Sequence, residues 1–193
     1  MIRIAVEADV PAILSIYAPY ILTTTYTFEY TVPSDEEFLQ RFRDTTQQFP
    51  WLVWEEDGQI LGYAYGSAPF ARAAYRWCCE GSIYLRPQAR GRGIGKKLYL
   101  ALEAIFRMQG YRKAYAIITS ENSDSLAFHR RLGYEHLAEF PECGFKHGRW
   151  LGVTWMEKTL KSDTIPSFFP TPWPSVMQDV EKFPNILDIL SLS

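Results

Sequence analysis

Cysteine is scarce in this 193-residue chain. The three cysteines are Cys78, Cys79 and Cys143, and no two of them form a C-x-x-C pair. An odd number with two neighbours excludes a disulfide framework and a zinc ribbon, because both need spaced pairs. Cys78 and Cys79 lie in an expected strand, where neighbouring side chains point to opposite faces. We therefore expect reduced thiols and a cytoplasmic protein that holds no metal.

Excess positive charge and long apolar runs are also missing. Lysine and arginine number 20 against 22 acidic residues, a net charge of −2. A protein that binds nucleic acid through its general field carries a basic surplus, so we expect no nucleic-acid partner. No apolar stretch approaches the ~20 residues of a membrane-spanning helix. No basic segment followed by an apolar run opens the chain, so we expect neither membrane insertion nor secretion.

Glycine is concentrated where the positive charge is. Gly91, Gly93 and Gly95 occupy alternate positions between an expected strand ending near Leu85 and an expected helix. Missing side chains let backbone N–H groups converge, and the N-terminus of a helix leaves such donors unpaired. The stretch predicts an anion site suited to a diphosphate. Basic residues surround it: Arg90, Arg92, Lys96 and Lys97.

The spacing of these glycines separates the known diphosphate loops. A dinucleotide fingerprint needs glycine where Lys96 stands, and a Walker loop needs serine or threonine where Lys97 stands. The pattern R-x-x-G-x-G fits Arg90, Gly93 and Gly95. The alternative is an ordinary glycine-rich strand-to-helix turn. The loop resembles the acetyl-CoA pyrophosphate loop of the GNAT superfamily of N-acetyltransferases.

Periodicity predicts an α/β domain over residues 1–161. Alternating and helical patterns place a strand at 77–85, a helix from the glycine loop to about 109 and a strand at 114–119, which makes a parallel β-α-β unit. Asp57-Gly58 joins two expected strands as a hairpin, Ser34 with Glu37 forms a capping box, and Gly110 ends the long helix. Two antiparallel strands, 134–140 and 149–158, close the domain. The resemblance implies a mixed, mostly antiparallel sheet with a splayed central parallel pair flanked by helices.

Residues 162–193 differ in composition. Five prolines interrupt this tail, yet its aromatic residues are too apolar for a solvated linker. We expect the tail to pack on the domain or on a second copy of it, with a last helical turn near Ile186–Leu190.

Further motifs narrow the resemblance to one branch of the superfamily. Through them the chain resembles phosphinothricin acetyltransferases and the related enzymes that acetylate methionine sulfone and sulfoximine. The matching runs are Thr25–Glu29, Ala74–Trp77, Glu80–Leu85, Asn122–Tyr134 and Gly144–Trp150. The resemblance implies acetyl-CoA as co-substrate, a small amino-acid-like amine as acceptor and a homodimer. Gly152 departs from it, because these enzymes usually carry an acidic residue there.

The resemblance also implies the cofactor site. The pantetheine arm would pair with backbone groups of Ile83, Tyr84 and Leu85, as a ligand pairs with a sheet edge. Asn122 would bond the far end of that arm, or else cap a helix. The diphosphate would lie on Arg90, Gly91, Arg92, Gly93, Ile94, Gly95 and Lys96.

Two residues are the catalytic candidates. An α-amine of pKa ~8 is about one-tenth neutral at pH 7, so a carboxylate suffices as its base. Glu80 is that carboxylate by resemblance; alternatively it pairs with Arg72 or Arg76. His129 stands where many acetyltransferases have a tyrosine that protonates the departing thiolate, and an imidazole could do so near neutral pH. The alternative is a surface histidine.

The acceptor pocket is expected around Phe28, Glu29, Arg72 and Tyr75, with the segment Lys146-His147. Arginine suits a carboxylate or phosphinate, although Arg72 could equally be a solvated side chain. Two other functions remain open at this point. One is an acetyltransferase for peptide N-termini or polyamines, and the other is a non-catalytic acetyl-CoA sensor.

Overall fold

A seven-stranded sheet organises the computed structural model, which describes residues 1–162 and 168–179. The strand order is β1-β2-β3-β4-β5-β7-β6, and among the described pairs only β4 and β5 run parallel. The predicted fold class is confirmed. The strands are β1 (Ile2–Ile4), β2 (Trp51–Glu56), β3 (Gln59–Ser67), β4 (Cys78–Leu85), β5 (Lys113–Thr119), β6 (Glu135–Lys146) and β7 (Arg149–Thr159).

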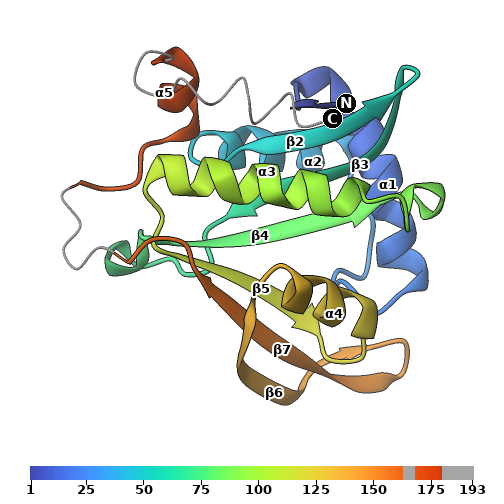
Figure 1. Cartoon of the computed structure of the whole chain (residues 1–193). Coiled ribbons are helices and arrows are strands. Elements are labelled where there is room, and N and C mark those ends of the chain that lie inside the picture. The colour runs from blue at the N-terminus through green and yellow to red at the C-terminus, as the bar shows by residue number, and fades with distance from the viewer. Residues whose placement is uncertain (163–167, 180–193) are drawn as a thin grey trace.

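Helices cover both faces of this sheet (Figure 1). On one face of the sheet, residues of α1 and α2 pack with residues of β2 and β3 in one buried cluster. On the opposite face, residues of α3 pack against the sheet in a second buried cluster. The helices are α1 (Val10–Thr23), α2 (Asp35–Thr46), α3 (Ile94–Gln109), α4 (Ser123–Arg131) and α5 (Trp173–Gln178). Single 3₁₀ turns lie at Glu7–Asp9, Ala73–Tyr75 and Pro87–Ala89.

Strand β4 shows how the two faces are separated. Cys79 is fully buried and Gly81 approaches Tyr99 of α3, whereas Tyr84 packs edge-on against Tyr17 of α1 at 4.8 Å. Successive side chains of a strand point to opposite faces, so odd-numbered residues of β4 face α3 and even-numbered residues face α1. This parity decides below which groups of β4 face which cavity.

The local signals predicted from sequence are confirmed at three places. Ser34 accepts from the Glu37 N–H while the Glu37 carboxylate accepts from the Ser34 N–H. Asp57 and Gly58 turn the β2–β3 hairpin with φ of +50° and +74°. Gly110 ends α3 with φ +94°, a conformation that a residue with a Cβ rarely adopts.

The closing hairpin is longer than expected. Strand β6 continues to Lys146 instead of ending at Phe140, and its pairing with β7 is irregular between Phe140 and Gly144. Pro141 has no N–H to donate to a ladder, so the sequence suggested an end where the structure places a bulge. Pairing with β7 resumes at Gly144, which lies opposite Leu151.

The described part of the tail packs on the domain. Trp173 and Val176 of α5 are 5% and 0% exposed and belong to the same buried cluster as α3. Gln109, the last residue of α3, binds both backbone groups of Thr171 in the tail. Its backbone carbonyl accepts from Thr171 N–H at 2.7 Å, and its side-chain amide donates to Thr171 O at 2.9 Å. The predicted last helical turn near Ile186–Leu190 lies outside the described residues. No helix among those residues has both the length and the apolarity to cross a membrane.

We expect Trp173→Ala to lower the free energy of unfolding by about 3–5 kcal/mol, because it leaves a large cavity in the main core. That loss corresponds to a Tm lower by roughly 6–20 °C for a chain of this size. Phe168→Ala is the matched control, since Phe168 is 86% exposed and its removal costs little. Equal melting temperatures for both variants would contradict this role of the tail.

Candidate active site

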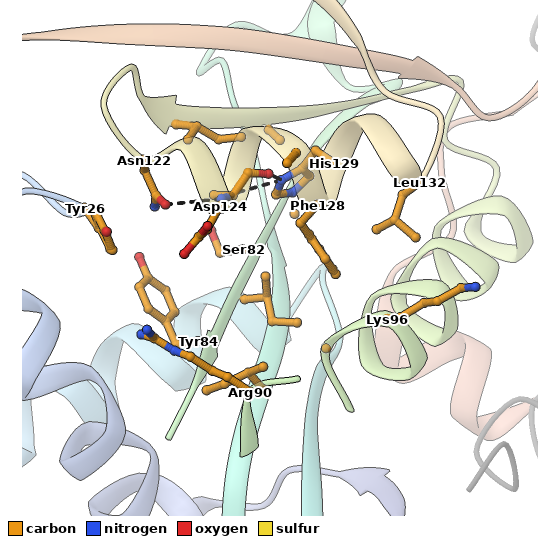
Figure 2. A pocket seen from close by; sticks show the side chains of 18 of the residues that line it. Tyr26, Ser82, Tyr84, Arg90, Lys96, Asn122, Asp124, Phe128, His129 and Leu132 are labelled. Carbon is orange, nitrogen blue, oxygen red and sulfur yellow. Dashed lines mark hydrogen bonds between the residues drawn. The ribbon is translucent and has the colours of Figure 1, made fainter. Parts of the chain in front are cut away.

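The parallel pair β4–β5 comes apart part-way along its length. Cys78, Cys79 and Glu80 pair with Lys113, Ala114 and Tyr115, and the pairing stops there. A cavity of about 560 Å³ follows, within the usual size of a small-molecule site. Its walls come from the free ends of β4 and β5, the glycine loop before α3, and α4 (Figure 2).

Backbone groups of β4 are presented to this cavity in alternation. Arg86 N–H donates to Leu61 O of β3, so even-numbered residues of β4 hydrogen-bond β3. Tyr84 lies opposite Tyr63 in that ladder, which leaves Ile83 and Leu85 with their N–H and C=O toward the gap. The expectation that Tyr84 offers backbone groups to a ligand is therefore not supported, although the residue does line the cavity.

Tyr20 is a cavity residue that the sequence analysis missed. Its hydroxyl donates to Leu85 O at 2.6 Å and accepts from the Arg90 guanidinium at 2.8 Å. The same guanidinium lies 5.6 Å from the centre of the Tyr20 ring. Leu85 thus already has a partner, and Ile83 is left as the residue whose backbone faces the gap. The sequence offered no signal for this role, because helical periodicity does not identify a residue at the rim of a cavity.

The glycine loop ends on the first turn of α3. Gly93 is the N-cap residue with φ +80°, and Gly91 has φ +73°. A Cβ on Gly95 would lie 3.2 Å from Leu85 Cδ1, so a glycine here lets the helix approach β4 closely. The arrangement directs unpaired N–H groups and the positive end of the helix dipole into the cavity, as a diphosphate requires.

The predicted basic rim is only partly directed at the cavity. Arg90 and Lys96 line it, with Gly91, Gly93 and Gly95. Arg92 instead forms an ion pair with Glu56, in which one guanidinium nitrogen donates to both carboxylate oxygens at 2.8 and 2.9 Å. The side chain of Ile94 is 2% exposed and lies in the core. These two positions can contribute backbone groups alone.

Asn122 satisfies both interpretations that the sequence left open. It is the N-cap of α4, where its Oδ1 accepts from Ser125 N–H at 3.2 Å, and it also lines the cavity. In Figure 2, Asn122 and the α4 residues Asp124, Phe128 and His129 lie on one side of the pocket and Arg90 lies on the other.

Glu80 lies at the last paired position before β4 leaves β5. It is opposite Ser67 of β3 and Tyr115 of β5. No ion pair or hydrogen bond joins its carboxylate to another described residue, so the alternative pairing with Arg72 or Arg76 is not found. Burial without a counter-charge raises the pKa of Glu80 to about 7. A carboxyl group that is half ionised near neutral pH can accept a proton from an ammonium group.

His129 is buried rather than on the surface, at 3% exposure. Its Nδ1 lies 2.8 Å from Ser125 O, and since a carbonyl only accepts, Nδ1 carries the proton. Burial lowers the pKa of His129 to about 4, so the ring is neutral at pH 7 and Nε2 has no proton. The geometry does not favour the expected role as an acid, although the residue does line the cavity.

Two of the expected acceptor-binding residues lie together near the end of β6. The ring of Phe28 covers Gly144, where a Cβ would come within 2.2 Å of it. Glu29 accepts from Tyr17 at 3.1 Å and from Arg41 at 2.7 Å. Lys146 is buried beside them and donates to Thr27 O at 2.7 Å.

Arg72 and Tyr75 lie elsewhere. Both are exposed and line a second cavity of about 670 Å³, whose far wall is formed by residues 169–172 of the tail. The structure therefore does not bring the four expected acceptor-binding residues into one pocket. Gly152 is confined, because a Cβ there would lie 3.1 Å from Ser120 Oγ. Among the described residues, no group of three or more His, Cys, Asp or Glu side chains could hold a metal ion.

Comparison with known proteins agrees with this geometry. Residues 2–155 match the family model described as "Acetyltransferase (GNAT) domain". The chain belongs to the GNAT acetyltransferase family. The predicted resemblance and the prediction of an acetyltransferase enzyme are confirmed.

Curated members of the GNAT family share much of this chain. A Pseudomonas aeruginosa L-methionine sulfoximine/L-methionine sulfone acetyltransferase is 41% identical over 82% of this chain and 94% of its own. A phosphinothricin N-acetyltransferase from Alcaligenes faecalis is 36% identical over 83% of each chain. A crystal structure of a phosphinothricin acetyltransferase from Sinorhizobium meliloti in complex with AcCoA has a TM-score of 0.82 and 41% identity, and the match covers 89% of this chain and 92% of that one.

Two glycines with nearly the same backbone conformation test the glycine loop. Gly93 and Gly58 have φ of +80° and +74°, and a Cβ on either meets nothing within 4 Å. The open space at Gly93 is the cavity itself, whereas that at Gly58 is the outside of a hairpin. Both alanine variants carry a similar backbone strain of about 1–2 kcal/mol. We expect Gly93→Ala to raise the Kd for CoA by about ten-fold or more and Gly58→Ala to leave it unchanged, by calorimetric titration. An unchanged Kd for Gly93→Ala would contradict the site.

Proposed function

We propose that this chain transfers the acetyl group of acetyl-CoA to the α-amine of a small amino-acid-like substrate of the phosphinothricin or methionine sulfoximine type. Curated relatives with these activities, at 36% and 41% identity, support the substrate class. The observation that carries the proposal is the position of Glu80. A half-buried carboxyl group of raised pKa stands where β4 leaves β5, one residue before Gly81, which lines the cavity that ends at the N-terminus of a helix.

Acetyl-CoA would occupy the cavity between β4 and β5. Its diphosphate would accept from the backbone N–H groups of the glycine loop, and Arg90 and Lys96 would add positive charge. Its pantetheine arm would pair with the backbone of Ile83, in the manner of an added strand, and reach Asn122.

The chemical step would be direct attack in a ternary complex. The amine of the acceptor attacks the thioester carbon, its proton passes to Glu80, and the C–S bond breaks to release CoA thiolate. An N–H group of β4 would polarise the thioester carbonyl as negative charge develops on it. An α-amine needs little help, because its pKa is only about one unit above neutrality.

The departing thiolate would need no acid from the protein. A thiol of pKa ~8.5 is a tolerable leaving group, and a neutral His129 without a proton on Nε2 cannot supply one at pH 7. We place His129 in the cavity wall, where its ring packs edge-on against Tyr99 and Phe128 at 5.0 and 5.1 Å.

The acceptor pocket, the homodimer and the boundary near residue 161 remain predictions. Phe28 and Glu29 would lie on one wall of the pocket, near Lys146. Arg72 and Tyr75 could join them only through a rearrangement of the loop or through a second subunit.

Replacing the proposed base gives the most direct test of the mechanism. We expect Glu80→Gln to lower kcat/KM by about 10²–10⁴-fold while the Kd for acetyl-CoA stays the same. In the wild type, kcat/KM should fall below pH about 7 as Glu80 is protonated. It should level off above pH ~8, where Glu80 is ionised and the free amine is neutral and able to attack. In the variant, the fall of kcat/KM due to protonation of Glu80 should disappear. The remaining rate should rise only as the ammonium group of the acceptor loses its proton.

The same variant also provides a test of whether Glu80 has the expected effect on stability. Burial raises the pKa of Glu80 from 4.5 to about 7, so the wild type loses stability as pH rises between these values. Glutamine does not ionise, and the Tm of the variant relative to wild type should therefore be higher at pH 8 than at pH 4.5. Glu135→Gln, at an exposed position on β6, should leave rates and pH profile unchanged. A Glu80→Gln enzyme with the wild-type kcat/KM would exclude Glu80 as the base.

A panel of acceptor amines distinguishes the proposed substrate class from the alternatives. Release of free thiol from acetyl-CoA is measured with methionine sulfone, methionine sulfoximine, phosphinothricin, short peptides and polyamines. We expect turnover with the first three compounds and at least ten-fold lower kcat/KM with the others. Preference for peptides or polyamines would overturn the substrate class. Tight binding of acetyl-CoA without turnover on any amine would identify a sensor.

A further inference from the structure

Tyr99 makes a contact that the fold alone does not require. Its side chain leaves α3 and is completely buried, and its hydroxyl donates to Gly81 O at 3.1 Å. Gly81 follows Glu80, the last residue of β4 that pairs with β5. The hydroxyl therefore reaches the main chain of the sheet at the point where the parallel ladder ends.

The register shows which donor the hydroxyl replaces. Lys113 N–H donates to Trp77 O at the start of the pair. In a parallel ladder this pattern repeats every two residues, so an unbroken ladder would bring Ile117 N–H to Gly81 O. Tyr99 supplies the donor for Gly81 instead, and Ile117 lines the cavity.

Gly81 is the residue that admits the hydroxyl. A Cβ at this position would lie 2.6 Å from the Tyr99 oxygen and 3.0 Å from its Cζ, closer than a side chain tolerates. The Tyr99 ring is held edge-on by Phe128 at 5.6 Å and His129 at 5.0 Å, both of α4. It thus stands between α3, α4 and β4 and cannot turn away without disturbing all three.

We propose that Tyr99 is a positioning residue that keeps β4 and β5 apart and so keeps the cofactor cavity open. Its hydroxyl occupies the acceptor through which the next rung of the ladder would form, which leaves the backbone of Ile83 and Ile117 available to a ligand. This inference rests on the proposed binding of acetyl-CoA between β4 and β5. Burial raises the pKa of Tyr99, so its hydroxyl remains a neutral donor throughout the working pH range.

The test is Tyr99→Phe, which removes the hydroxyl and keeps the ring. Gly81 O then lacks its donor, and closure of the ladder by Ile117 N–H would satisfy it. We expect the Kd for CoA and the KM for acetyl-CoA to rise by about ten-fold or more, with the KM for the amine unchanged. Hydrogen exchange at the Ile117 amide should slow by at least ten-fold in the free enzyme. If the role of Tyr99 were purely structural, the variant would change hydrogen exchange at other amides as well as at Ile117. It would also change both KM values together.

Tyr111→Phe is the matched control. Tyr111 is buried in the same core cluster, and its hydroxyl accepts from the Gln48 side chain at 2.9 Å, away from β4 and the cavity. This variant should keep the wild-type Kd and Ile117 exchange. If Tyr99→Phe does not fold, Gly81→Ala displaces the hydroxyl by another route and should show the same split in KM.

The outcomes separate this inference from the proposed function. A wild-type protein that does not bind CoA overturns the proposed function, whatever the variants do. Wild-type binding of CoA together with an unchanged Kd in Tyr99→Phe overturns the role of Tyr99 alone. An increase in Kd without slower Ile117 exchange also overturns it, because the cavity would then not have closed by ladder formation.

Discussion

The site depends on where one parallel ladder stops. β4 and β5 pair over three residues each and then separate, although both strands continue. Backbone groups left unpaired inside a protein are costly unless a ligand or a side chain satisfies them. The separation therefore creates the cavity and leaves in its wall backbone groups with which an amide-bearing ligand can pair. The same point in the fold partly buries Glu80, the last residue of β4 that pairs with β5.

Neighbouring elements hold this separation in place by different means. Tyr99 reaches Gly81 from α3, Tyr20 reaches Leu85 from α1, and Asn122 begins α4 at the other wall. These contacts come from segments far apart in the chain, and each satisfies a backbone group near the cavity. A site assembled in this way can be rigid without a ligand, which reduces the ordering that binding must otherwise offset.

The electrostatics of the site follow from burial more than from charge pairs. Glu80 has a raised pKa and His129 a lowered one, both because water is excluded around them. Arg92, in contrast, is used on an exposed ion pair with Glu56 and adds little at the cavity. Positive charge at the proposed diphosphate position thus comes from the helix N-terminus, Arg90 and Lys96.

The sequence by itself determined the α/β class, the glycine loop, the order of the elements and the position of Glu80 on a strand. These follow from periodicity and from residues such as Gly58 and Gly110, whose backbone conformation is set locally. Only the tertiary structure decided that His129 is buried and neutral, that Tyr84 turns its backbone to β3, and that Arg72 and Tyr75 lie apart from Phe28 and Glu29. Those properties depend on which segments meet across the sheet. The spacing of residues along the chain does not show how far a side chain is shielded from water, which residues it contacts, or which neighbouring strand its backbone faces.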